Sequence, residues 1–180
     1  YNVIVDHSSF SWATDEVVQI WFDARDITIQ WSIISEALDC STHSKGCHGK
    51  GMLIGSGGSG NISIHHNLFA HNRDRNPMIT TRDGPVDLVN NVIYNMGHGI
   101  GAYDNAGETQ LNIVGNDFKY GNNTDRNQFE IKPFRARDGY GHSLYVVGNI
   151  GPHRPTDEYP EDVLIAEDAR WYVTEERHDA

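Results

Sequence analysis

The stretch Ile62-Ser63-Ile64-His65-His66-Asn67-Leu68-Phe69 carries the pattern that decides the fold. Two apolar residues flank a variable one, two more variable residues follow, and a small polar residue then precedes further apolar residues. This pattern occurs six times, with its small polar residue at Ser8, Ser32, Asn67, Asn91, Asn116 and Asn149. Separations of 24, 35, 24, 25 and 33 residues between these positions predict a solenoid with one short alternating strand per unit.

Elementary physics supports a solenoid. Alternating apolar residues turn one face of each strand inward. The small polar residue is expected at a turn, where its side chain bonds the same residue in the coils above and below and satisfies buried backbone groups. A β-sandwich is the alternative, but its strands recur about every 8–12 residues, and Asn-Gly and Asp-Gly hairpin turns are rare here. The sequence therefore predicts an all-β fold, a parallel β-helix.

The coil pattern indicates a single solenoid over residues 1–152. The repeat is lost beyond it, so residues 153–180 are expected to form an extension that packs on the solenoid or is partly irregular. Arg170-Trp171-Tyr172-Val173 could add one more strand, and Gly55–Gly60 predicts a flexible connector. No apolar run approaches about 18 residues, so no membrane-spanning helix is expected.

The chain is acidic, with 14 Lys and Arg against 25 Asp and Glu and a formal net charge of -11. This balance argues against a general nucleic-acid binder. A polyanionic ligand would need a local basic cluster. Lysines in the glycine-rich segment 43–55 and arginines just after the strand of residues 62–69 supply two such segments.

Two sets of residues have the chemistry of metal ligands. Asp15 and Glu16 are adjacent carboxylates that suit a hard cation such as Ca²⁺, and a solvated acidic turn is the plain alternative. The second set has the residue types of a zinc site: Cys40, His43, Cys47 and His48. A disulfide that braces this long loop in an oxidising compartment, or a pair of free thiols, is equally compatible with the two cysteines.

Several segments, in the same order and at the same spacing, resemble the calcium-dependent pectate lyases of the right-handed parallel β-helix type (polysaccharide lyase family 1). The segments are Val5–Glu16, Ile27–Ile34, His48–Gly55, His66–Phe69 with Arg75–Pro77, and Asn90–Tyr94. The likeness covers roughly residues 3–95, and the coil pattern extends it to about 150. It implies calcium-assisted β-elimination of polygalacturonate (pectate) by a secreted, extracellular or periplasmic enzyme, otherwise monomeric, with no nucleic-acid or membrane partner.

The resemblance also implies roles for individual residues. Arg75 matches the family's base, which removes the proton at C5 of a galacturonosyl unit. Lys50 matches the lysine that holds the substrate carboxylate, and Lys45 is a second candidate for that contact. Further substrate contacts are expected from His48, Arg73 and Arg82. The family's calcium carboxylate falls on Asp15, with Glu16 as a helper.

The chain departs from the family pattern at informative places. Met78 and Thr80 stand where the family usually has arginines, and Gln19 stands where a second calcium carboxylate is common. The family also draws a calcium ligand from a coil that would precede residue 1. An uncapped solenoid end exposes apolar surface and strand edges. We therefore expect residue 1 to be an internal cut, with N-terminal coils of the same protein or a partner chain packing on Val3–Phe10.

Other functions remain open from the residues alone. One is a lyase of the same fold that acts on another uronate polymer, or on methylated pectin without calcium. A second is a non-catalytic, polysaccharide-binding β-helix, which Met78, Thr80 and Gln19 favour. A third is a purely structural solenoid, which would not need Lys50 and Arg75 in register.

Overall fold

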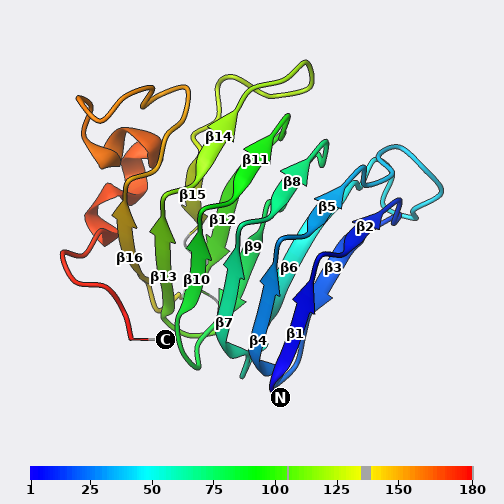
Figure 1. The fold of residues 1–180 in the computed structure, drawn as a ribbon, viewed down its shortest axis with the longest axis horizontal. Coiled ribbons are helices and arrows are strands. Elements are labelled where there is room, and N and C mark those ends of the chain that lie inside the picture. Colours follow the sequence, from blue (N-terminus) through cyan, green and yellow to red (C-terminus); the bar gives the residue numbers. More distant parts are fainter. Residues whose placement is uncertain (105, 135–138, 180) are drawn as a thin grey trace.

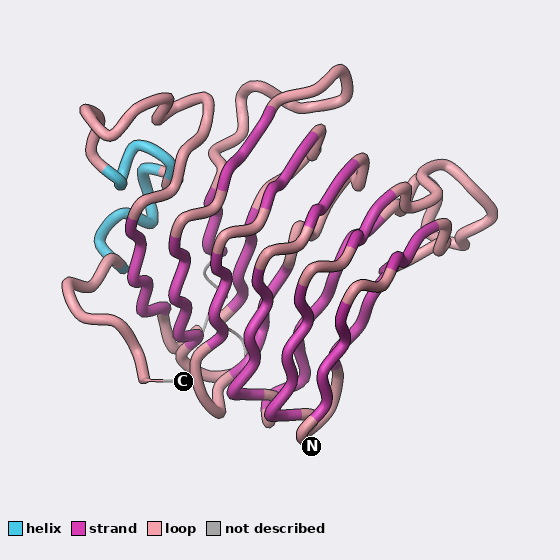
Figure 2. Tube along the Cα trace, viewed as in Figure 1, coloured by secondary structure: helices cyan, strands magenta, loops and turns pink. Residues whose placement is uncertain are grey.

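The strands of this protein form three parallel sheets that wind together along one axis (Figure 1). The structure is a computed structural model that describes residues 1–104, 106–134 and 139–179, without the side chains of residues 56 and 57. The chain passes from sheet to sheet and then returns to the first, so each strand pairs with the equivalent strand of the next coil (Figure 2). The predicted all-β parallel β-helix is confirmed.

Sheet A consists of β1 (Val3–Asp6), β4 (Arg25–Gln30), β7 (Gly60–His65), β10 (Val86–Val89), β13 (Thr109–Val114) and β16 (His142–Val147). Sheet B consists of β2 (Ser9–Ser11), β5 (Ile33–Ser35), β8 (Leu68–Ala70), β11 (Val92–Tyr94) and β14 (Asp117–Lys119). Sheet C consists of β3 (Glu16–Ile20), β6 (Lys50–Gly57), β9 (Met78–Thr81), β12 (Ile100–Tyr103) and β15 (Ile131–Phe134).

The register of sheet A follows the sequence repeat without a shift. The first apolar residue of each unit pairs with its counterpart in the next, in the order Val3, Ile27, Ile62, Val86, Leu111 and Leu144. The first position is buried from Ile62 onward, and the next inward-facing position is buried along five of the strands, at Ile29, Ile64, Leu88, Ile113 and Val146. These stacked side chains form the centre of the core, because side chains two residues apart share one face of a strand.

The small polar residues of the repeat form a continuous ladder at the turn from sheet A to sheet B. The backbone N–H of Asn67 donates to Oδ1 of Asn91 at 3.0 Å, and that of Asn91 donates to Oδ1 of Asn116 at 3.0 Å. The residue just before the ladder position adopts a positive φ, +56° at His66 and +53° at Asn90. The predicted ladder is confirmed, and its amides satisfy backbone groups at a turn that solvent does not reach.

The glycine-rich run Gly55–Gly60 is not a flexible connector, and that prediction was wrong. β6 continues to Gly57 and β7 begins at Gly60. Ser59 is fully buried, and its hydroxyl donates to the backbone oxygen of Gly55 at 2.8 Å. A Cβ on Gly60 would lie 1.9 Å from the backbone oxygen of Asp83, so that glycine permits close packing of neighbouring coils.

The C-terminal extension covers the last coil with two short 3₁₀ helices, η1 (Glu161–Leu164) and η2 (Glu167–Tyr172), beside β16 (Figure 1). Leu164, Ile165 and Tyr172 are buried there. The strand predicted for Arg170–Val173 was wrong, because residues 170–172 lie in η2 and Val173 forms an isolated bridge with Leu144. The chain turns to cover the apolar end of the coils instead of adding another rung.

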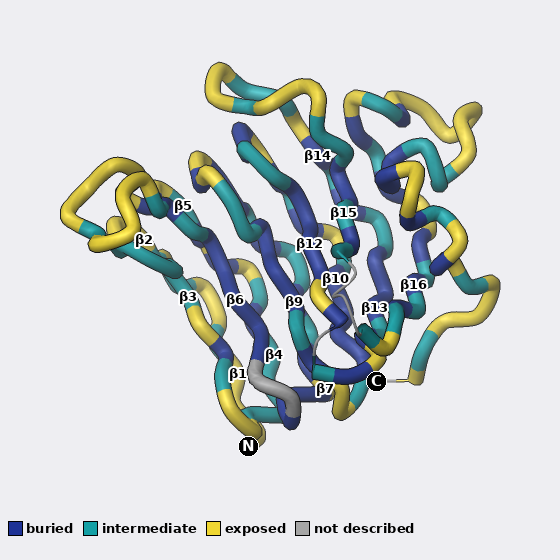
Figure 3. Tube along the Cα trace, turned by 180° about the vertical axis from the view of Figure 1, so that it is seen from behind, coloured by how far each residue is buried: buried dark blue, intermediate teal, exposed yellow. Residues whose placement is uncertain are grey.

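Buried residues line the inside of the coils, whereas the long loops and the first strand are more exposed (Figure 3). In β1, Val3 and Ile4 are 44% and 70% exposed. The expectation that further coils pack on Val3–Phe10 stays a prediction. Among the described residues, no helix is both long and apolar enough to cross a membrane.

Arg154 fastens the C-terminal extension to the last coil. Its side chain is 6% exposed; Nη1 donates to the backbone oxygen of Asn149 at 2.7 Å, and Nη2 lies 3.3 Å from Oε1 of Glu161. We expect Arg154→Ala to lower the free energy of unfolding by about 2–4 kcal/mol, somewhat less than a fully buried pair, because the Glu161 carboxylate still reaches solvent. Urea denaturation measures this change. The exposed Arg126→Ala is the control, and equal effects of the two variants would contradict the anchoring role.

Candidate active site

Lys50 begins β6 and is held by a carboxylate from the following coil. Its Nζ lies 2.6 Å from Oδ2 of Asp74, and the two residues also form an isolated parallel bridge. The other Asp74 oxygen accepts from the backbone N–H of Arg75 at 2.7 Å and lies 3.4 Å from Nδ1 of His98. Burial raises the pKa of Asp74, but hydrogen bonds from His98, Lys50 and Arg75 outweigh it and hold that pKa well below its usual range. Asp74 is therefore a carboxylate that fixes the Lys50 ammonium.

Arg75 is brought against a residue of an earlier coil. Its guanidinium pairs with Oε1 of Glu16, at the start of β3, whose side chain is 6% exposed. The Arg75 backbone has φ of +59°, and its oxygen accepts from the N–H of Met52 at 2.8 Å. Burial lowers the pKa of Arg75, while the negative charge of Asp15, and that of Tyr103 when its phenol is ionised, act in the opposite direction. Glu16 pairs with Lys50 at the start of their strands in sheet C. Lys50 and Arg75, the two cations that the sequence singled out, therefore lie close together at one edge of this sheet, the edge at which its strands begin.

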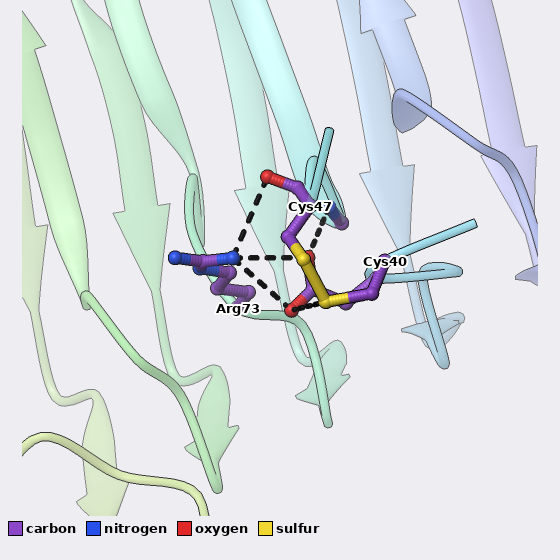
Figure 4. The surroundings of a disulfide bond; sticks show 5 residues. Cys40, Cys47 and Arg73 are labelled. Atoms are coloured by element: carbon purple, nitrogen blue, oxygen red, sulfur yellow. Dashed lines mark hydrogen bonds and ion pairs between the residues drawn. A yellow bond between two sulfur atoms is a disulfide. The ribbon is translucent and has the colours of Figure 1, made fainter. Parts of the chain in front are cut away.

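A disulfide closes the long loop beside this edge. Cys40 and Cys47 are bonded, and Arg73 points at the loop they close (Figure 4). Nη1 of Arg73 lies 3.3 Å from both carboxylate oxygens of Asp39 and donates to the backbone oxygen of Cys47 at 3.4 Å. The disulfide alternative is confirmed. The zinc site with four ligands and the free thiols were wrong, because both sulfur atoms are consumed in the bond.

Asp15 faces two histidines of the same loop. Nε2 of His48 lies 3.1 Å from Oδ1 of Asp15, and Nε2 of His43 lies 3.5 Å from Oδ2. The two imidazoles stack with centroids 4.2 Å apart. Oδ1 of Asp15 and Nε2 of His48 are buried without a hydrogen-bond partner, so their short separation is not an aligned hydrogen bond. Burial, followed by the charge of Lys50, lowers the pKa of His48.

These surroundings do not fit a calcium site built from Asp15 and Glu16. Calcium takes about six to eight oxygen ligands. The Glu16 carboxylate is engaged by Arg75 and accepts from Nε2 of Gln19 at 3.3 Å. The groups that the described part of the chain brings against Asp15 are imidazole nitrogens. Calcium therefore stays a prediction that would need oxygen ligands besides these.

The remaining predicted substrate residues lie farther out. Lys45 is exposed in the disulfide loop, and its backbone N–H donates to Nδ1 of His43 at 3.1 Å. Arg82 follows the far end of β9, where Thr81 pairs with Gly57. At about 3.3 Å per residue, that end of β6 lies roughly 20 Å from Lys50. The structure thus gathers Lys50, Arg75, Glu16, Asp15, His48 and Arg73 in one region and leaves Arg82 apart.

Three side chains of this region were missed from the sequence: Asp39, Asp74 and His98. Asp74 carried a weak signal, since it is an acid between two arginines in an otherwise basic segment. Asp39 and His98 carried no signal in the sequence, because each contacts a residue of another coil and the loop conformations decide those contacts. All three hold a predicted cation or the residue that pairs with it.

Comparison with curated proteins finds several relatives that all carry the same name. The chain is 41% identical over 130 residues, 71% of its length, to "Probable pectate lyase C" of Aspergillus fumigatus, and covers 28% of that protein. It is 42% identical over 155 residues, 85% of its length, to the protein of the same name from Aspergillus terreus, and covers 33% of it. The chain thus spans about a third or less of the length of these relatives.

No family model matches the chain. Identity near 40% over most of 180 residues, together with the parallel sheets, nevertheless confirms the resemblance that the motifs predicted. Over most of its length, the chain is a homologue of one segment of the proteins named pectate lyase C.

Proposed function

We propose that this chain carries the catalytic cations of a pectate lyase, which cleaves polygalacturonate by β-elimination. The observation that carries the proposal is the placement of Lys50 and Arg75 at one edge of sheet C in a homologue of pectate lyases. A purely structural solenoid would not need two semi-buried cations from different coils at one edge. The disulfide supports a second part of the proposal, secretion into an oxidising compartment.

The proposed chemistry assigns one task to each cation. Lys50 binds the C6 carboxylate of a galacturonosyl unit and stabilises the negative charge that develops beside C5. Arg75, in its neutral form, takes the C5 proton; the electron pair left on C5 forms the C4–C5 double bond, the C4–O4 bond breaks, and O4 leaves and takes a proton from water. Arginine is rarely in the neutral form that can accept a proton, because its pKa exceeds about 12 in most settings. The burial of Arg75 beside sheet C lowers its pKa and so favours the neutral form.

The Glu16 carboxylate opposes the proposed role of Arg75 as a base. Its pair with Arg75 favours the charged guanidinium, so substrate has to disrupt that pair before Arg75 can accept a proton. The same observation favours a second candidate function, a non-catalytic β-helix that binds polysaccharide. In that protein both cations would serve as fixed positive charges.

We expect polygalacturonate incubated with this protein at alkaline pH to gain the ultraviolet absorbance of an unsaturated uronide. The rate is expected to rise with pH, because a larger fraction of Arg75 is neutral as the pH approaches its lowered pKa. A rise that a chelator stops and added calcium restores would support the calcium requirement that the family resemblance implies, with oxygen ligands besides Asp15 and Glu16. Binding of polygalacturonate without any absorbance change would instead support the non-catalytic candidate.

Lys50→Ala and Lys45→Ala form a matched pair that tests which lysine contacts the substrate. We expect Lys50→Ala to lower kcat/KM by about 10²- to 10³-fold, the cost of one donor that stabilises a developing oxyanion. Lys45→Ala is expected to change kcat/KM by less than about threefold, because its side chain is exposed in the loop while Lys50 is fixed by Asp74. Steady-state kinetics on polygalacturonate decide the matter, and the reverse order would transfer the role to Lys45.

A further inference from the structure

The disulfide-closed loop brings three metal-binding side chains to one point. Oxygen of Asp15 and ring nitrogens of His43 and His48 all lie within 4.8 Å of one another. The three residues come from the segment before β3 and from the loop that precedes β6, so the fold joins what the sequence separates by 28 and 33 residues. Each is partly buried, with 43%, 17% and 13% of the side chain exposed in that order.

Asp15, His43 and His48 do not satisfy one another's hydrogen-bonding groups. Each imidazole presents Nε2 to a different oxygen of the same carboxylate. Oδ1 of Asp15 and Nε2 of His48 are nevertheless buried without a hydrogen-bond partner. A buried polar atom left unpaired is destabilising, and a cation shared by the two atoms would pair both of them.

From this geometry we propose that Asp15, His43 and His48 form a binding site for a divalent transition metal, with Zn²⁺ as the preferred ion. Two imidazoles and one carboxylate are ligands that zinc binds in catalytic-type sites, where a fourth position stays open to water or another ligand. Calcium prefers a shell of oxygens and is a poor match for two ring nitrogens. The site goes beyond the proposed lyase function and does not depend on it.

The loop is constrained in the way that a metal site requires. The Cys40–Cys47 bond closes the segment that contains His43, and His48 follows it directly. Gly49 donates its backbone N–H to Oδ1 of Asp39 at 3.1 Å, which fixes the chain just beyond His48. Little loop entropy then remains to be lost when a metal binds.

Two features of the loop oppose metal binding and are expected to lower the affinity. His43 Nδ1 accepts from the backbone N–H of Lys45, so ligation through Nε2 would move the ring proton to Nδ1 and break that bond. The amide is exposed and can turn to water. The charges of Lys45 and Lys50 also act on His48, but Asp74 neutralises Lys50 at 2.6 Å.

The test is a calorimetric titration of the whole chain, free of any affinity tag, with Zn²⁺ in non-reducing buffer near pH 7.5, where unperturbed histidines are neutral. We expect one saturable site per chain and a higher melting temperature with zinc. Calcium at a large excess should not compete for it. Because neither readout uses polygalacturonate, loss of the lyase proposal would leave this result untouched, and the reverse also holds.

Three variants separate this site from other histidines. His43→Gln, His48→Gln and Asp15→Asn each remove one ligand and should weaken zinc affinity by more than the roughly 10- to 100-fold that loss of an outer partner costs. His66→Gln is the control, since His66 belongs to another histidine pair, with His65 at 2.9 Å. The absence of saturable zinc binding would overturn the proposal. Equal binding by the three variants and wild type, or displacement of zinc by calcium, would overturn it too.

Discussion

Arg75→Lys is expected to lower kcat on polygalacturonate by about 10²- to 10⁴-fold, the usual contribution of a general base, with little change in KM. Lysine keeps the positive charge, so attraction to the polyanion remains. Its single nitrogen replaces a planar guanidinium whose Nη1 pairs with Oε1 of Glu16, so we do not expect it to occupy the same position. Steady-state kinetics at alkaline pH, with substrate binding measured separately, give the two quantities.

The control for this variant is Arg126→Lys, in the exposed part of the loop between β14 and β15. It should retain wild-type kcat. Urea denaturation establishes that Arg75→Lys is folded. This check is needed because the substitution weakens the ion pair with the buried Glu16 carboxylate. If the folded Arg75→Lys variant kept a kcat within a few-fold of wild type, Arg75 would not be the base.

Asn91→Ala is expected to lower the free energy of unfolding by about 3–5 kcal/mol, at the upper end of single substitutions. Asn91 is 2% exposed and donates through Nδ2 to the backbone oxygen of Ile64 at 2.8 Å and to Oδ1 of Asn116 at 3.0 Å. Its Oδ1 accepts from the backbone N–H of Asn67 at 3.0 Å. Alanine leaves these groups unpaired in the interior, at about 1–3 kcal/mol for each group that water cannot reach.

Asn122→Ala is the matched control, because Asn122 is exposed in the loop after β14. Its effect should stay within about 0.5 kcal/mol. Both variants are compared with wild type by urea denaturation, with the slope against urea checked for constancy. A loss below about 1 kcal/mol for Asn91→Ala would mean that the ladder is dispensable and that apolar stacking alone sets the coil register.

The coils could be predicted because their stabilising contacts repeat along the sequence. Each rung of sheet A places an apolar residue over its counterpart, as Ile62 lies over Ile27, and the asparagines repeat with them. The run Gly55–Gly60 misled the prediction because glycine content signals flexibility in a linker and close approach in a packed solenoid. Gly60 lies under the backbone of Asp83, a contact between coils that the local sequence does not encode.

The candidate site was predictable in part. Lys50 and Arg75 stood out because they are basic residues in family-like motifs, and the structure places both at one edge of sheet C. Their partners were not predictable, because the pairs of Lys50 with Asp74 and Arg75 with Glu16 cross from coil to coil. The sequence grouped His43 and His48 with the cysteines as one alternative, and it predicted a substrate contact for His48. It did not place either histidine beside Asp15, because the path that carries His43 over Asp15 depends on how the loop folds back.

The mass of the products formed from a defined oligogalacturonate tests the central claim most directly. Elimination adds no water, so the two fragments from one cleavage must together have the mass of the substrate, and one fragment must carry the C4–C5 double bond. We expect this result for the wild-type chain and its loss in Arg75→Lys. Fragments that together are heavier by one water would show hydrolysis and would contradict the proposed roles of Lys50 and Arg75. Saturable binding with no cleavage would contradict them as well.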